Sequence, residues 1–130
     1  MTTTHELTAV RSNGRVIALR LLSGLVALIF LAAGMAKLAG AAAMVDMFST
    51  VGLGQWFRYF TGVLEVGGAV GVLMPRYSSY AAALLAIVMV GAIVAHLTVL
   101  GESPVPATVL FVLTAVIAYL RKPYTEVHSN

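Results

Sequence analysis

Residues 57–74 read FRYFTGVLEVGGAVGVLM, an apolar stretch with one glutamate, Glu65, near its middle. A charged side chain at the centre of a bilayer costs roughly 2.5–3.5 kcal/mol on insertion scales, so an intramembrane carboxylate faces protein or water. Three further apolar stretches accompany this one, at residues 16–36, 80–100 and 105–120. The pattern of the chain is therefore four apolar segments, one of which carries a buried acid.

The composition is that of a membrane protein. The 130 residues are 60% hydrophobic and 10% charged, whereas soluble domains contain about a quarter charged residues. Hydrocarbon about 30 Å thick requires roughly 17–25 helical residues, and a helix satisfies all its backbone groups within lipid. The first and third stretches fit this length well, the second adequately, and the fourth is slightly short. The sequence predicts an all-α fold, a four-transmembrane-helix bundle whose surroundings are the lipid bilayer.

The basic residues predict the orientation. Four crossings place both termini and the loop between the second and third helices on the same side. That side is cytoplasmic by the positive-inside rule, which also explains the net charge of +3 without a nucleic-acid partner. We therefore expect an inner (plasma) membrane protein with cytoplasmic tails at 1–14 and 123–130 around a membrane domain at 15–122. The cytoplasmic cations would be Arg11, Arg15, Arg20, Arg76, Arg121 and Lys122, against Lys37 and Arg58 outside.

A cleavable signal peptide is the competing interpretation of the first stretch. Ala39, Gly40 and Ala41 look like a small-residue cleavage site. The apolar run is longer than the usual core of roughly 7–15 residues, and Lys37 lies between the run and that site. We therefore expect the first stretch to be a transmembrane helix.

A short amphipathic pattern separates the first two stretches, at residues 41–51. Met44, Met47, Phe48 and Val51 recur at i, i+3, i+4 and i+7. The segment is too short to cross the bilayer, so the pattern predicts an interfacial helix in the outer leaflet. Its apolar stripe is more typical of an interface or a cover over the bundle than of a cofactor site.

Four ionisable residues are the candidate ligand-binding residues: Lys37, Glu65, His96 and Arg58. Each of these residues shares a helix face with small or apolar residues, which favours a side chain that points into the bundle. At 1.5 Å per residue, His96 lies about 6 Å and Glu65 about 12 Å below the outer ends of their helices. Lys37 can reach down from near the surface, so the first three can converge in the outer half. Either Lys37 or Arg58 could pair with Glu65.

Several chemistries are disfavoured. The chain has no cysteine, which removes thiol chemistry. His96 is the only histidine within the apolar stretches, so a haem held by two histidines is disfavoured. One histidine and one glutamate are also too few ligands for a metal site. No serine nucleophile accompanies a base. We expect no catalytic residue, no haem, no metal and no enzymatic activity of the chain on its own.

Three runs resemble the DoxX family: LIFLAAGMAKLAG at 28–40, GVLEVGGAVGVL at 62–73 and MVGAIVAHL at 89–97. The resemblance covers roughly residues 15–120. It implies a four-helix membrane protein and, for some relatives, an association with quinone-linked oxidation such as thiosulfate:quinone oxidoreductase. Carried over by position, it draws attention to Lys37, Glu65 and His96.

Three functions remain open at this stage. The bundle could bind a lipophile such as a quinone in its outer half, as an accessory subunit beside a membrane redox partner. It could instead be an assembly protein whose small-residue faces pack against partner helices or a second copy. A proton or solute pathway is the third, disfavoured by the lack of inverted repeats. Each residue also has a structural interpretation: Lys37 as a helix anchor, Glu65 as half of an ion pair, His96 as a helix contact.

Overall fold

The structure, a computed structural model, describes the backbone of residues 4–121 and the side chains of residues 13–121. All regular secondary structure in this part of the chain is helical, which confirms the predicted all-α fold. The elements are α1 (Thr4–Ala39), α2 (Ala42–Val51), α3 (Gln55–Leu73), α4 (Ser78–Ala95), its π-helical continuation η1 (His96–Leu100) and α5 (Val105–Leu120).

The first helix is longer than predicted. It begins at Thr4 rather than at residue 16, so most of the expected N-terminal tail continues α1. Extending an existing helix gains one hydrogen bond per residue without a new nucleation cost, so polar residues can prolong an apolar helix. The predicted tail at 123–130 lies outside the described residues. The other predicted helices agree closely with α3, with α4 plus η1, and with α5.

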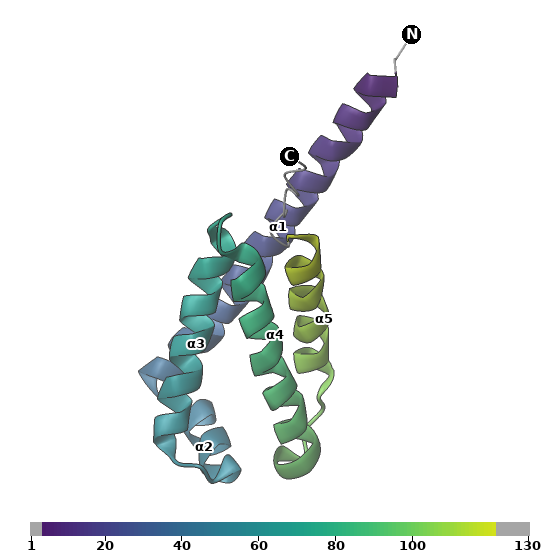
Figure 1. The fold of residues 1–130 in the computed structure, drawn as a ribbon. Coiled ribbons are helices and arrows are strands. Elements are labelled where there is room, and N and C mark those ends of the chain that lie inside the picture. Colours follow the sequence, from purple (N-terminus) through teal and green to yellow (C-terminus); the bar gives the residue numbers. More distant parts are fainter. Residues whose placement is uncertain (1–3, 122–130) are drawn as a thin grey trace, which may run out of the picture.

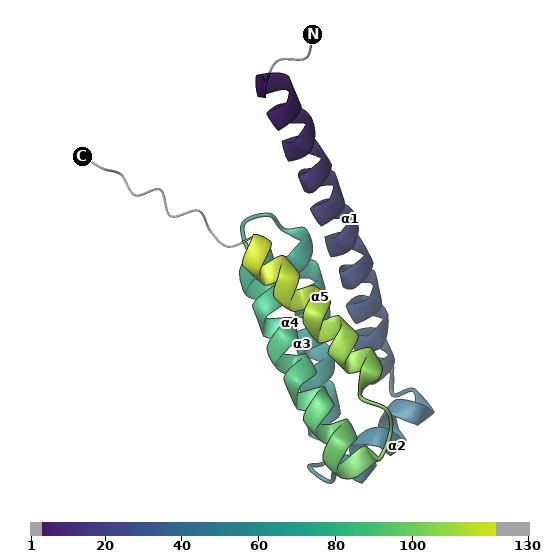
Figure 2. The same cartoon turned by 90° about the vertical axis from the view of Figure 1, so that its right-hand side faces the viewer.

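The long helices lie side by side (Figures 1 and 2). α3 packs between α1 and α4, and α5 packs against α4 and α1. The N-terminal part of α1 projects beyond the other helices, and α2 lies at the opposite end of the molecule, where it contacts α3 and η1.

Glycines bring the helices close together, as the small-residue pattern predicted. A Cβ atom on Gly34 of α1 would lie 2.9 Å from the carbonyl oxygen of Gly62 in α3. On the other side of α3, a Cβ on Gly68 would lie 2.5 Å from Leu85, and one on Gly71 would lie 2.7 Å from the Cβ of Ala81. Small residues allow such backbone approach in lipid, where van der Waals packing holds helices together.

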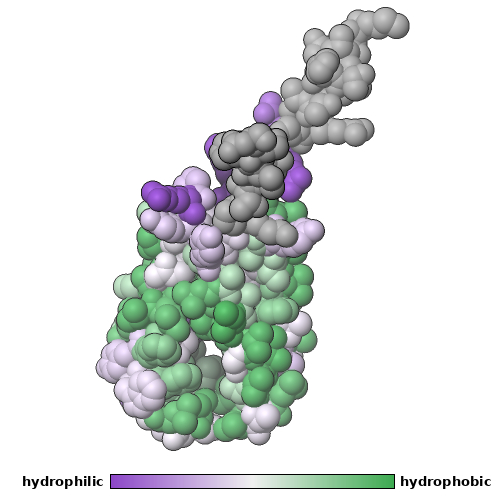
Figure 3. Space-filling model, in the orientation of Figure 1, coloured by the Kyte–Doolittle hydropathy of each residue, from purple (hydrophilic) through white to green (hydrophobic). Residues whose placement is uncertain are grey.

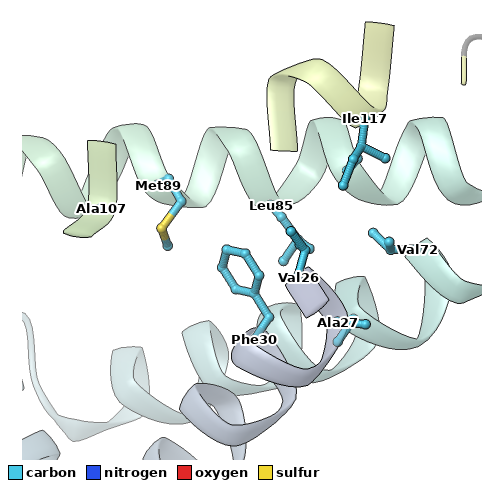
Figure 4. Close-up of a cluster of buried hydrophobic side chains, with 10 residues drawn as sticks. Val26, Ala27, Phe30, Val72, Leu85, Met89, Ala107 and Ile117 are labelled. Carbon is cyan, nitrogen blue, oxygen red and sulfur yellow. The ribbon is translucent and has the colours of Figure 1, made fainter. Parts of the chain in front are cut away.

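The apolar core lies where α1, α3, α4 and α5 meet (Figure 4). Phe30, Leu85 and Ile117 are its largest fully buried apolar side chains. Val26 and Val72 are also fully buried in this cluster. The core thus holds the two helix pairs, α1 with α3 and α4 with α5, in one body.

The outside of the bundle is apolar. Large exposed hydrophobic residues occur on every long helix, and on the face that Figure 3 shows, the surface below the polar end is mostly apolar, with some paler patches. Among the described residues, two segments are long and apolar enough to cross a membrane, Asn13–Ala39 and Ser78–Leu100. Only 22% and 17% of the most apolar windows of these two segments are buried inside the structure, unlike a core helix in a soluble protein.

Two glycines set the position of α2. Gly40, before it, has a φ of +73°, and Gly52, at its C-terminal end, has a φ of +83°. This left-handed backbone conformation disfavours other residues because of their Cβ atoms. The turns that it allows place α2 against α3 and η1 instead of continuing α1.

We expect Gly34→Ala to lower the free energy of unfolding by about 1–3 kcal/mol, because the added methyl would press on the Gly62 carbonyl. Gly67→Ala is the matched control: a Cβ there meets nothing within 4 Å. Thermal unfolding in detergent measures both variants. Equal stability of the two would contradict the close α1–α3 contact.

Candidate functional site

An ion pair joins α1 to α3. The Nζ of Lys37 lies 2.9 Å from Oε1 of Glu65 and donates a hydrogen bond to Oε2 at 3.3 Å. The Glu65 side chain is 2% exposed and that of Lys37 is 13% exposed. The expected pairing of Glu65 with a basic side chain is therefore present, and Lys37 is the partner.

Helix geometry explains why these two residues meet. α1 and α3 run in opposite directions (Figure 1). Side chains tilt toward the N-terminus of their own helix, so Lys37 and Glu65, on antiparallel helices, lean toward each other. The Gly34–Gly62 contact lies one turn from both residues and brings the backbones close enough for the side chains to connect.

Arg58 has a different environment from the one expected. Its guanidinium is buried, with 5% of the residue exposed. Nη1 donates to the carbonyl oxygen of Lys37, and Nε donates to Oε1 of Gln55 at 2.8 Å. Gln55 in turn donates from Nε2 to the carbonyl oxygen of Val45 in α2, at 3.1 Å. Arg58 thus ties the end of α1 to α3 and α2, and it does not line the cavity described next.

A cavity of about 450 Å³ lies between the helices, and Lys37, Glu65 and His96 all line it. The structure therefore brings together three of the four candidate residues. The rest of the wall is almost entirely apolar and comes from all five helices. It includes Phe30, Ala33, Met44, Met47, Phe48, Val51, Phe57, Phe60, Leu64, Ile87, Val88, Met89, Ala92, Ala95, Pro106, Ala107 and Leu110.

The cavity follows from the way α3 and α4 pack. The two helices touch at Gly68 and Gly71 and diverge toward the end where α2 lies (Figure 1). Contacts between α2 and η1 span the gap at that end. Figure 3 shows the molecule hollowed in this region, between the part formed by α2 and α3 and the part formed by α4.

His96 has a buried ring nitrogen that makes no hydrogen bond within the described part of the chain. It begins the π-helical segment η1, a local widening of the helix that is frequent at functional sites. Its Nδ1 is buried and has no hydrogen-bond partner among the described residues, and the nearest carboxylate oxygen, of Glu102, is 3.9 Å away. A buried nitrogen left unpaired costs about 1–3 kcal/mol, which a ligand atom could relieve.

The apolar stripe of α2 lies on one face of the helix, as the sequence predicted. The sequence did not predict that this stripe lines the cavity. Met44, Met47, Phe48 and Val51 line the cavity, whereas Asp46 on the other face is exposed. The i, i+3, i+4, i+7 spacing was the available signal. It indicates a buried face, and the space that the face covers depends on tertiary packing.

Comparison with known proteins identified one family. Residues 21–119 of the chain match the DoxX-like family. No curated protein and no solved structure gave a significant match to the chain. The matched range contains α2, α3, α4 and η1 entirely, and it contains Lys37, Glu65 and His96.

Single substitutions of the ion pair should destabilise the bundle strongly. Lys37→Met or Glu65→Gln would leave one buried charge without its partner, and we expect each to cost about 3–5 kcal/mol. The double variant Lys37→Met/Glu65→Gln should recover most of that loss, because no charge remains uncompensated. A double-mutant cycle compares the free energies of unfolding of wild type and of these three variants in one detergent. Additive losses in the double variant would show that the two side chains do not interact.

Proposed function

The chain belongs to the DoxX-like family, and from this membership and the cavity we propose that it binds a lipophilic ligand between its helices. A quinone is the ligand class that fits best, and the chain would act as a non-catalytic, accessory membrane subunit of quinone-linked redox metabolism. The observation that carries the proposal is the apolar cavity with Lys37, Glu65 and His96 on its wall.

The size and lining of the cavity support a small ligand. Small-molecule sites are concave, largely apolar, about 300–1,000 Å³ in volume, and contain a few polar groups that fix the ligand's orientation. The cavity has about 450 Å³ and this kind of lining. Phe48 and Phe57, with ring centroids 5.8 Å apart, contribute an aromatic wall. Flat rings pack well against such side chains.

The polar groups match the chemistry of a quinone. Its carbonyl oxygens accept hydrogen bonds, which the Lys37 ammonium and a protonated ring nitrogen of His96 can donate. A quinone carries its own redox chemistry, so the protein has to supply binding, orientation and a group that exchanges protons. Glu65 is the carboxyl group on the cavity wall that would exchange these protons. A protein partner would then supply or remove the electrons.

The same proposal includes the arrangement in the membrane. α1, α3, α4 and α5 would each cross the bilayer of the plasma membrane, with α2 in the outer interface and both termini in the cytoplasm. The apolar exposed surface and the excess of Lys and Arg on one side support this topology. The site would then lie in the outer half of the bilayer.

A second function, as an assembly protein, is favoured by one observation. A shallow apolar groove runs along the outer face of α5, lined by Phe111, Val112, Ala115, Val116, Tyr119 and Leu120. A helix of another membrane protein or of a second copy would fit such a face. Ligand binding is preferred because the ion pair and His96 face the internal cavity, which an assembly role would leave unused.

We expect His96→Ala to lose the bound lipophile without losing stability, because His96 Nδ1 has no hydrogen bond to give up among residues 13–121 and the exposed Glu102 carboxylate is 3.9 Å away. The measurement is mass spectrometry of organic extracts from protein purified in mild detergent, together with thermal unfolding. Thr98→Ala is the matched control, since Thr98 lies in the same segment but does not line the cavity. Wild-type protein without any stoichiometric lipophile would contradict ligand binding.

The topology can be tested with single cysteines, since the chain has none of its own. Ser49→Cys on α2 and Ser103→Cys before α5 should react with a membrane-impermeant maleimide added to intact cells from which any outer membrane has been removed. Tyr77→Cys, between α3 and α4, should react only after the membrane is opened. All three positions are exposed. Labelling of Tyr77→Cys in sealed cells would reverse the proposed orientation.

A further inference from the structure

The cavity is open on one side. Phe60 of α3 and Ile87 of α4 both line it, and they are 51% and 69% exposed. A side chain that contributes to an internal wall and also to the outer surface marks the rim of an opening. Phe60 and Ile87 belong to α3 and α4, the two helices that diverge (Figure 1), and the molecule is visibly hollowed in this region (Figure 3).

The opening lies on the flank of the bundle, not at its ends. At one end α2 contacts η1, and at the other Gly68 and Gly71 hold α3 against α4. Val63 and Val90 lie three residues, about one helical turn, after Phe60 and Ile87, and both are exposed and apolar. A flank of this composition faces acyl chains if α3 and α4 cross the membrane.

Gly91 lies at this opening and leaves it free of a side chain. It is on α4, it lines the cavity, and it is exposed. A Cβ atom at this position would meet nothing within 4 Å. Gly91 therefore differs from the glycines that bring helices together, such as Gly34 and Gly68: helix packing does not require it.

The charges within the cavity indicate what kind of head group fits. Lys37 and Glu65 compensate each other at 2.9 Å, so no unbalanced full charge is left to attract an ionised ligand. An ionised head group would have to give up its hydration for a site that offers hydrogen bonds but no net charge, which is costly. An uncharged molecule with a hydrogen-bonding oxygen avoids that cost.

We infer that the site takes an uncharged, membrane-dissolved molecule that enters sideways from the bilayer between α3 and α4, through an opening that Gly91 keeps free. The inference rests on the proposed ligand-binding function and adds to it the route, the charge class and the residue that controls access. Neither the outer aqueous phase nor the cytoplasm is the source of the ligand.

The test compares Gly91→Phe with Gly67→Phe in proteoliposomes. Both glycines are exposed helix positions where a Cβ meets nothing within 4 Å, but only Gly91 lines the cavity. The probe is a benzoquinone with a decyl tail, and the reporter is the fluorescence of Trp56, the only tryptophan of the chain. Its ring contacts those of Phe57 and Phe60, at centroid distances of 5.7 and 6.3 Å, and both phenylalanines line the cavity.

Stopped-flow mixing separates access from affinity. We expect wild-type protein and Gly67→Phe to show the same saturable quenching above the linear background of probe dissolved in lipid. In Gly91→Phe the rates of association and release should both fall, by about tenfold, with the equilibrium constant within about twofold of wild type. The wild-type association rate should follow the mole fraction of probe in the lipid rather than its total concentration.

Three results would count against the inference. Unchanged rates in Gly91→Phe, with saturable quenching in the wild type, would overturn the lateral route and leave ligand binding intact. A lower affinity with an unchanged association rate would do the same, because the new ring would then merely occupy the cavity. Absence of saturable quenching in the wild type and in Gly67→Phe would overturn the proposed function itself.

Discussion

The contact between Lys37 and Glu65 is the constraint on which the structure depends. Burying either charge alone in an apolar bundle is costly. The attraction between the two charges offsets that desolvation cost only at short range and in good geometry. At 2.9 Å, with Glu65 almost fully enclosed, that condition is met. It in turn requires α1 and α3 to approach closely, which Gly34 and Gly62 permit. Arg58 reinforces the same junction through the carbonyl group of Lys37.

The tight packing of one region produces the cavity of another. α3 is held to α4 where Gly68 and Gly71 lie, so the far ends of the two helices are free to diverge, and α2 covers the space between them together with η1. The ion pair and His96 are the polar points of an otherwise apolar wall. Binding energy from the apolar wall combined with orientation by a few polar groups is the general design of small-molecule sites.

Much of this could be predicted from the sequence. Apolar length predicted the helices, small residues predicted the close contacts, and the cost of a buried charge predicted a partner for Glu65. The choice between Lys37 and Arg58 depended on side-chain tilt and on the position of the Lys37 backbone carbonyl, which accepts a hydrogen bond from Arg58; only the fold reveals both. The cavity was also beyond prediction, because it arises from the divergence of α3 and α4. Likewise, helix periodicity marks the inner face of α2 without showing that it borders a space.

The most direct test is an experimentally determined structure of the protein in lipid nanodiscs, at a resolution that separates side chains. The account predicts the Lys37 ammonium within hydrogen-bonding distance of the Glu65 carboxylate, as in the 2.9 Å contact described above. It also predicts non-protein density in the cavity, in contact with His96. A Glu65 carboxylate that faces the acyl chains, away from Lys37, with the space between α3 and α4 closed by side chains, would contradict it.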